Sequence, residues 1–170
     1  MPERYKIIRH GIYTLITLLL FILQTARGVE IKVLGAQPDY LIFFIAAMGM
    51  YEGAYVTAIY GFAAGLALSV SSMSAEGLLA IYYGLFGLFC GHFSATYMRK
   101  IVFWPAIIGS IGMIVKGLIG YVFYYWLAYG APFLPYAEGI VFKIVMSVPF
   151  SFLFFLITSR MHKHVSEKEQ

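Results

Sequence analysis

Few residue types in this chain are suited to catalysis or metal binding, and those that are stand at the wrong spacing. The single cysteine, Cys90, lies two residues before His92. On a helix, positions i and i+2 point about 200° apart, so these two side chains cannot bind the same ion. Cys90 is therefore expected to be a small apolar packing residue, and a single cysteine excludes an intramolecular disulfide.

The motifs of common catalytic sites are also missing from the sequence. It contains no Gly-x-Ser-x-Gly, no His-Glu-x-x-His, no phosphate-binding loop and no pair of acidic residues within one apolar segment. His92 is expected to be a satisfied membrane histidine, and His162 and His164 to be solvated in a polar tail. We therefore expect neither an enzyme nor a bound cofactor or metal.

Lys116 is the charged residue that most needs an explanation, because it lies within an apolar segment. Four glycines of this segment fall within an arc of about 140° on a helix, and Lys116 lies inside that arc: Gly109, Gly112, Gly117 and Gly120. A charge facing lipid at mid-bilayer costs at least ~2.5–3.5 kcal/mol, so the lysine should point into the bundle or toward a partner chain. No acidic residue is expected at its depth. Its amine should therefore pair with carbonyls, tyrosines, water or a carboxylate of another protein.

The overall composition is that of a membrane protein. Hydrophobic residues make up 61% of the chain and charged residues 12%, against roughly 25% charged in a typical soluble domain. The net charge of +4 comes from basic residues that flank apolar segments, so nucleic-acid binding is not expected. Lipid is expected to be the main solvent.

Six apolar segments approach the roughly 20 residues that a helix needs to cross a bilayer. They lie at about 11–26, 39–51, 53–71, 77–97, 102–129 and 138–159. The first follows basic residues but lacks a cleavage site, so we expect a retained anchor. A turn at Tyr51-Glu52-Gly53 separates the second from the third, and whether the short second segment crosses the whole bilayer is left open. Two prolines are expected to keep 131–135 out of a helix.

Basic residues are distributed unequally between the two predicted sides. One side holds eight of them, namely Arg4, Lys6, Arg9, Arg99, Lys100, Arg160, Lys163 and Lys168. The other holds only Arg27 and Lys32, so both termini should be cytoplasmic. Lys143, near the outer end of the last segment, should extend to the headgroups, where Glu76 and Glu138 could pair with it. We predict an all-α integral membrane protein with one domain, a compact bundle of about six transmembrane helices.

The fourth segment carries a stripe of small residues. Its members fall within an arc of about 80° on a helix: Gly77, Ala80, Gly84, Gly87, Gly91 and Ala95. Because helices in lipid associate by close backbone approach, the stripe favours a plain helix contact over a substrate path.

A series of short motifs runs through the first half of the chain. In order, they are Pro38-Asp39, Gly53, Gly61-Phe62-Ala63-Ala64-Gly65-Leu66, Gly77-Leu78, and Gly87 with Gly91. Together with the chain length, the six segments and the short basic ends, this order resembles the bacterial rod shape-determining family MreD. The family often has an acid three residues after the first Gly-Leu pair, Gly65-Leu66, where this chain has Ser69. By their chemistry alone, Pro38 suits a first helical turn and Asp39 the positive end of the helix dipole.

The resemblance implies a non-enzymatic scaffold of the cell-elongation machinery in the bacterial cytoplasmic membrane. MreD proteins associate with the bitopic protein MreC and, through it, with MreB, RodA and a penicillin-binding transpeptidase. On this hypothesis, the glycine faces, with Gly84 and Gly87, and Lys116 form or support the surface for the single span of MreC.

A second class of small six-helix proteins resembles the chain in size and hydropathy. The substrate-binding components of energy-coupling-factor transporters bind a vitamin or metal ion from their outer loops. They usually carry Ala-x-x-x-Ala faces on the first and third helices, and the first segment here lacks one. We prefer the scaffold interpretation.

Overall fold

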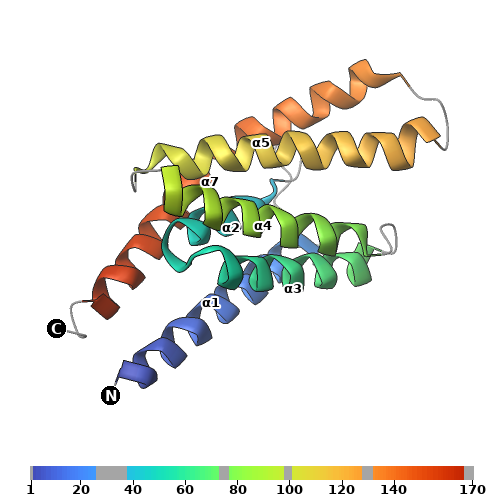
Figure 1. Ribbon diagram of the computed structural model, residues 1–170. Coiled ribbons are helices and arrows are strands. Elements are labelled where there is room, and N and C mark those ends of the chain that lie inside the picture. The colour runs from blue at the N-terminus through green and yellow to red at the C-terminus, as the bar shows by residue number, and fades with distance from the viewer. Residues whose placement is uncertain (1, 26–37, 73–76, 98–100, 128–131, 167–170) are drawn as a thin grey trace.

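The protein is a bundle of helices packed lengthwise. A computed structural model describes residues 2–25, 38–72, 77–97, 101–127 and 132–166, and every element within these ranges is helical. The elements are α1 (Pro2–Thr25), α2 (Tyr40–Glu52), α3 (Ala54–Ser72), α4 (Leu78–Tyr97), α5 (Phe103–Gly120), the π-helical segment η1 (Tyr121–Trp126) and α7 (Phe133–Ser166). The start of α1 and the end of α7 lie at one end of the bundle, which we call the terminal end, and the opposite end is the distal end (Figure 1). The predicted all-α class is confirmed for the described residues.

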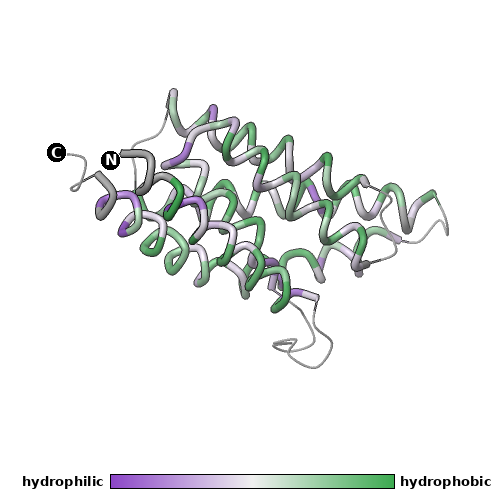
Figure 2. The backbone as a smooth tube through the Cα atoms, turned by 90° about the horizontal axis from the view of Figure 1, so that it is seen from below, coloured by the Kyte–Doolittle hydropathy of each residue, from purple (hydrophilic) through white to green (hydrophobic). Residues whose placement is uncertain are grey.

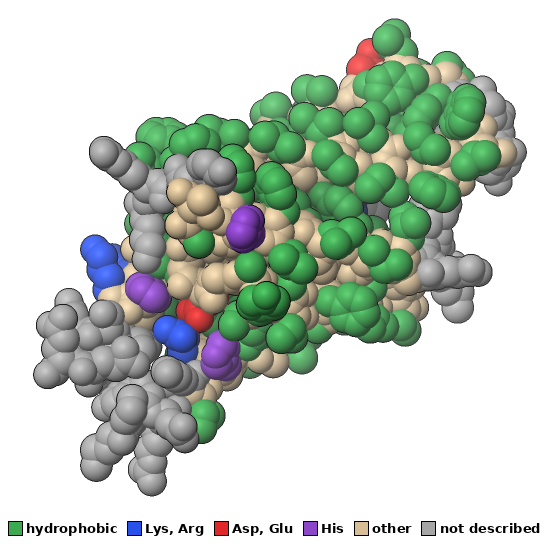
Figure 3. Space-filling view, viewed as in Figure 1, with side chains coloured by type: hydrophobic (Ala, Val, Ile, Leu, Met, Phe, Trp, Pro, Cys, Tyr) green, Lys and Arg blue, Asp and Glu red, His purple; other side chains and the backbone are tan. Residues whose placement is uncertain are grey.

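Five of the helices are long and apolar enough to cross a membrane. Their spanning stretches are Ile7–Thr25, Ala54–Ser71, Leu78–Thr96, Phe103–Phe123 and Phe133–Lys163. Hydrophobic residues occur along these helices (Figure 2), and apolar side chains cover the face in Figure 3, with basic and histidine side chains gathered at the terminal end. The chain therefore has the form of a multi-pass membrane protein.

The sixth helix, α2, is short and central. Its 13 residues extend only about 20 Å, less than the thickness of the hydrocarbon layer. The residues from Tyr40 to Met50 are all buried, because α2 packs against α3, α4, α5 and α7. A helix that is apolar on every side belongs in a core, and α2 forms the core of this bundle.

The segment around the two prolines differs from the prediction. The last helix begins at Phe133, not near residue 138, and therefore includes Pro135. Pro135 is the third residue of α7, where backbone N–H groups lack an acceptor within the helix, so proline is tolerated. Pro105 occupies the same position in α5.

The turn between α2 and α3 is as tight as the sequence predicted. Gly53 alone separates the two helices and has a φ of 82°, a conformation that favours glycine. Beside it, the side chain of Glu52 is only 2% exposed, and its Oε2 lies 3.1 Å from Nη2 of Arg9. This ion pair joins α1 to the end of α2 at the terminal end.

Small residues bring α3 and α4 into the most extensive helix contact of the bundle. A methyl group on Gly65 of α3 would lie 2.7 Å from Cα of Ala80, and one on Gly87 of α4 would lie 2.5 Å from the carbonyl oxygen of Thr57. Real side chains do not approach this closely. The part of the stripe from Ala80 to Gly91 is thus a helix contact, the role that its sequence favoured, whereas a methyl group on Gly77 would have nothing within 4 Å and Ala95 is exposed.

We expect Gly87→Ala to destabilise the protein by about 1–3 kcal/mol, because the new methyl group overpacks the α3/α4 contact. Gly11→Ala is the matched control, since nothing lies within 4 Å of a methyl group built on that helical glycine. Thermal unfolding in a mild detergent, followed by circular dichroism, would compare the two. Equal melting temperatures for both variants would contradict the close packing at Gly87.

Candidate functional site

Asp39 is buried at the point where α2 begins. Its side chain caps the helix by accepting a hydrogen bond from the N–H of Ile42 at 3.5 Å, and the carboxylate lies at the positive end of the helix dipole. Its own N–H donates to Oγ of Ser147 in α7 at 3.0 Å. Asp39 therefore has the capping position that its sequence suggested, and Pro38 lies just outside the helix instead of in its first turn.

Lys116 donates to Oδ2 of Asp39 and forms an ion pair with it. Lys116 therefore points into the bundle, one of the two directions that the sequence left open, and the prediction that no acid lies at its depth is wrong. α2 ends at Glu52 and α5 begins at Phe103, both at the terminal end of the bundle. Asp39 lies thirteen residues before Glu52, and Lys116 lies thirteen residues after Phe103, so each is about 20 Å from that end. Because α2 is short, its first residues are buried inside the bundle instead of lying at the surface.

Two further side chains complete the pair. The Tyr83 hydroxyl of α4 donates to Oδ1 of Asp39 at 3.0 Å and accepts from Nζ of Lys116 at 2.9 Å. Nε2 of Gln24, near the end of α1, donates to the same Oδ1 at 3.2 Å. With Ser147, five helices therefore contribute to one polar cluster, which consists of Gln24, Asp39, Tyr83, Lys116 and Ser147.

Sequence reasoning missed three members of this cluster: Gln24, Tyr83 and Ser147. The distance of a residue from the terminal end, counted along its helix, gives a signal for Tyr83. Tyr83 stands fourteen residues before Tyr97, the end of α4, which places it about 21 Å from the terminal end, level with Asp39 and Lys116. A polar side chain at that level has few partners other than the ion pair.

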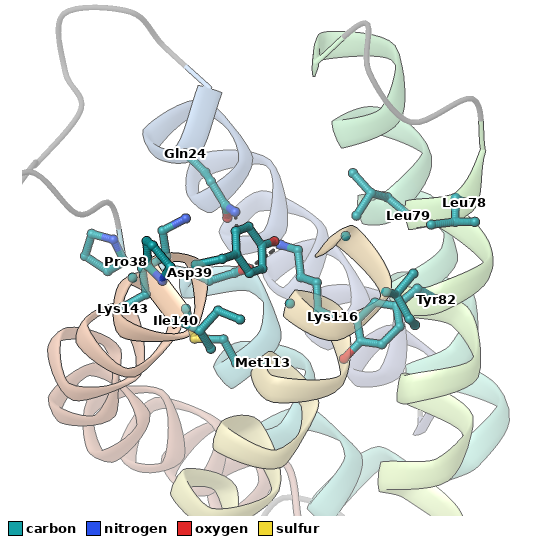
Figure 4. Close-up of a pocket in the computed structure, with 16 residues that line it drawn as sticks. Gln24, Pro38, Asp39, Leu78, Leu79, Tyr82, Met113, Lys116, Ile140 and Lys143 are labelled. Carbon is teal, nitrogen blue, oxygen red and sulfur yellow. Dashed lines mark hydrogen bonds and ion pairs between the residues drawn. The ribbon is translucent and has the colours of Figure 1, made fainter. Parts of the chain in front are cut away.

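A cavity of about 470 Å³ opens beside the cluster on its distal side (Figure 4). Its volume is within the range of about 300–1,000 Å³ that is usual for ligand pockets. The lining comes from α1, the start of α2, α4, α5 and α7, and includes Gln24, Asp39, Tyr82, Lys116, Tyr136 and Lys143. This is a polar cavity inside an apolar bundle.

Lys143 projects its charge into this cavity from α7. The side chain is exposed, and among the described residues no acceptor pairs with its amine. The expected pairing with Glu138 is not formed, and Glu76 lies outside the described residues. Lys143 and Lys116 outnumber Asp39, so the ionisable groups that line the cavity carry a net positive charge.

The residues of α3 and α4 that the sequence singled out lie away from this cluster, whereas Gly117 and Gly120 of α5 line the cavity beside Lys116. Those with the closest backbone approach, Gly61, Gly65, Gly87 and Gly91, pack between α3 and α4. Gly84 faces Phe62, with 3.3 Å between a built methyl group and Cβ of that residue. Phe62 and Leu66 are 47% and 43% exposed on α3. The glycine face of α4 and Lys116 thus do not form one surface.

Cys90 and His92 lie in different environments, as their spacing predicted. Cys90 is buried against Gly49, whereas His92 is exposed. Among the described residues, no group of three or more His, Cys, Asp or Glu side chains is arranged to hold a metal ion.

Comparison with known proteins adds no relative: no protein family model, no curated protein and no solved structure matches the chain. The chemistry of the site therefore has to be inferred from its geometry. In that geometry both carboxylate oxygens of Asp39 accept hydrogen bonds from protein donors. Both lysine amines have donors that no described residue uses, and such a site is suited to holding an anion.

We expect Lys116→Gln to destabilise the protein strongly, by about 3–5 kcal/mol, because it leaves the buried charge of Asp39 without its partner. Asp39→Asn should cost less, because the Lys116 side chain that it leaves unpaired is 25% exposed. The double variant should lose much less stability than the sum of the two single losses, because neither charge remains. Unfolding free energies of all four proteins in detergent would give the coupling. Lys143→Gln is the control and should be near neutral. Additive losses at residues 39 and 116 would contradict the pairing.

Proposed function

We propose that this protein is a non-enzymatic scaffold of the bacterial cell-elongation machinery, of the MreD type, in the cytoplasmic membrane. The ordered motifs between Pro38 and Gly91 carry the proposal, because they coincide with the framework of the bundle. Pro38-Asp39 introduces the central helix, and Gly53 makes the α2–α3 turn. The later motif glycines other than Gly77 lie between α3 and α4. MreC is the direct partner, and MreB, RodA and a penicillin-binding transpeptidase are engaged through it.

The best candidate surface for the MreC span is a groove between α1 and α3. The glycine stripe of α4 is already covered by α3, and Lys116 is paired within the bundle. The groove has a volume of about 710 Å³ and includes Ala63 and Ala67, one helical turn apart on α3. This small-x-x-x-small spacing allows a partner helix to approach closely.

Hydroxyl oxygens in the same groove can accept hydrogen bonds from a partner helix, because both hydroxyls already donate within the bundle. The hydroxyls of Thr14 and Tyr60 lie 3.2 Å apart across it, and the Tyr60 hydroxyl donates to the carbonyl oxygen of His10 at 2.9 Å. Hydroxyl groups at helix interfaces in membranes contribute modestly, by about 1 kcal/mol. Small residues with a few hydroxyls fit a single transmembrane helix better than they fit lipid chains.

The substrate-binding component of an energy-coupling-factor transporter remains the alternative. The observation that favours it is the polar cavity of about 470 Å³ at the distal end, which is large enough for a vitamin-sized molecule. Ala63 and Ala67 also provide the small-residue face that such proteins use on their third helix. The two functions differ in what accompanies the protein in the membrane.

Affinity purification from native membranes in a mild detergent, read by mass spectrometry for proteins and small molecules, would separate the two functions. We expect MreC, together with wall-synthesis enzymes, to be recovered. Recovery of ATPase subunits, or of a vitamin at one molecule per chain, would overturn the scaffold proposal in favour of transport.

The docking surface makes a separate prediction. Ala63→Leu with Ala67→Leu should lower the recovery of MreC at least about tenfold, because two bulky side chains would fill the helix-sized groove. Ala95→Leu, at an exposed position on α4 outside the groove, is the matched control and should leave recovery unchanged. Full recovery with the double variant, with its melting temperature retained, would place MreC elsewhere.

A further inference from the structure

The distal cavity has the charge of an anion site. An ammonium group has three N–H donors, and Lys116 uses two of them on Asp39 and Tyr83. Its side chain remains 25% exposed. Lys143 uses none of its donors on any described residue. Both lysines therefore have donors available to an anionic ligand, whereas both oxygens of Asp39 are occupied.

This cavity continues into an apolar groove. The groove separates α4 from α5, has a volume of about 630 Å³ and is lined almost wholly by aliphatic and aromatic side chains. Tyr82 and Ile119 line both the cavity and the groove, so the two spaces meet at these residues. The Tyr82 hydroxyl donates to the carbonyl oxygen of Gly112, which turns it away from any ligand and leaves the ring at the junction.

The groove is long enough to hold one acyl chain. Along α4 it extends from Tyr82 to Phe93, eleven residues or about 16 Å, which is about half of the hydrocarbon thickness. It begins at the distal cavity and leads toward the terminal end. A cationic chamber joined to an apolar channel of this length matches a molecule with an anionic head and a hydrocarbon chain.

We propose that the cavity and the groove together bind one anionic phospholipid, with its phosphate at the amines of Lys116 and Lys143 and one acyl chain between α4 and α5. Basic pockets between membrane helices bind anionic headgroups through charge-assisted hydrogen bonds. This site is separate from the α1/α3 groove assigned to the partner helix. It does not depend on the scaffold function.

Native mass spectrometry of the purified protein would test the proposal, with phosphatidylglycerol and phosphatidylcholine of identical acyl chains as probes. The wild type should bind phosphatidylglycerol at least about fivefold more tightly. Lys143→Gln should bring the ratio close to one without lowering the melting temperature of the lipid-free protein. Ile111→Trp, which fills the groove from an exposed position, should weaken both lipids.

Matched controls are available at exposed positions outside both spaces. Lys163→Gln and Ile81→Trp make the same changes there and should leave both affinities as in the wild type. Equal binding of the two lipids, or an unchanged preference in Lys143→Gln, would overturn the proposal.

Two other occupants would be recognised in the same experiment. Inorganic phosphate that competes with phosphatidylglycerol and binds wild type and Ile111→Trp equally would identify a small-anion site and overturn the lipid assignment. A protein span that crosslinks to a cysteine at position 111 and excludes lipid would overturn it in favour of a protein occupant.

Discussion

A charged side chain in the middle of a bilayer must be neutralised within the protein, and here Lys116 is neutralised by Asp39. The need to pair this charge constrains how five of the helices pack together. Asp39 is also the first capping residue of α2, so the pair fixes the depth at which the central helix begins. Tyr83 of α4 and Gln24 of α1 then donate to the carboxylate, and Ser147 of α7 accepts from the backbone N–H of Asp39. Such a network stabilises one arrangement of helices, because any other leaves a buried charge unpaired.

The small residues of the chain divide into two groups with different roles. Glycines of α3 and α4 are used within the bundle, where backbones approach too closely for any side chain. Ala63 and Ala67 remain at the surface of α3, in a groove that no described helix fills. Lipid provides no hydrophobic drive for helices to associate. A partner helix is therefore stabilised mainly by close van der Waals packing against such a small-residue face. The distinction explains why the partner surface is better placed on α3 than on α4.

The short α2 also accounts for the cavity. A helix of about 20 Å cannot fill a bundle whose other helices cross the membrane, so space remains on the distal side of Asp39. Lys116 and Lys143 make this space cationic, and the separation of α4 from α5 opens it to the lipid phase. An anionic lipid there would lie apart from the α1/α3 groove, so a scaffold could engage a protein and a lipid at the same time.

The sequence by itself determined the helical class, the short second helix, the turn at Gly53 and that Lys116 points away from lipid. Each of these follows from local pattern: apolar length, a glycine after a charge, and a lysine on a small-residue face. Only the tertiary structure decided the partner of Lys116, which lies 77 residues away in the chain, and the helix that covers each glycine face. The physical reason is that a pattern gives the direction of a side chain about its own helix. The depth and neighbours of that helix depend on how all the helices pack together.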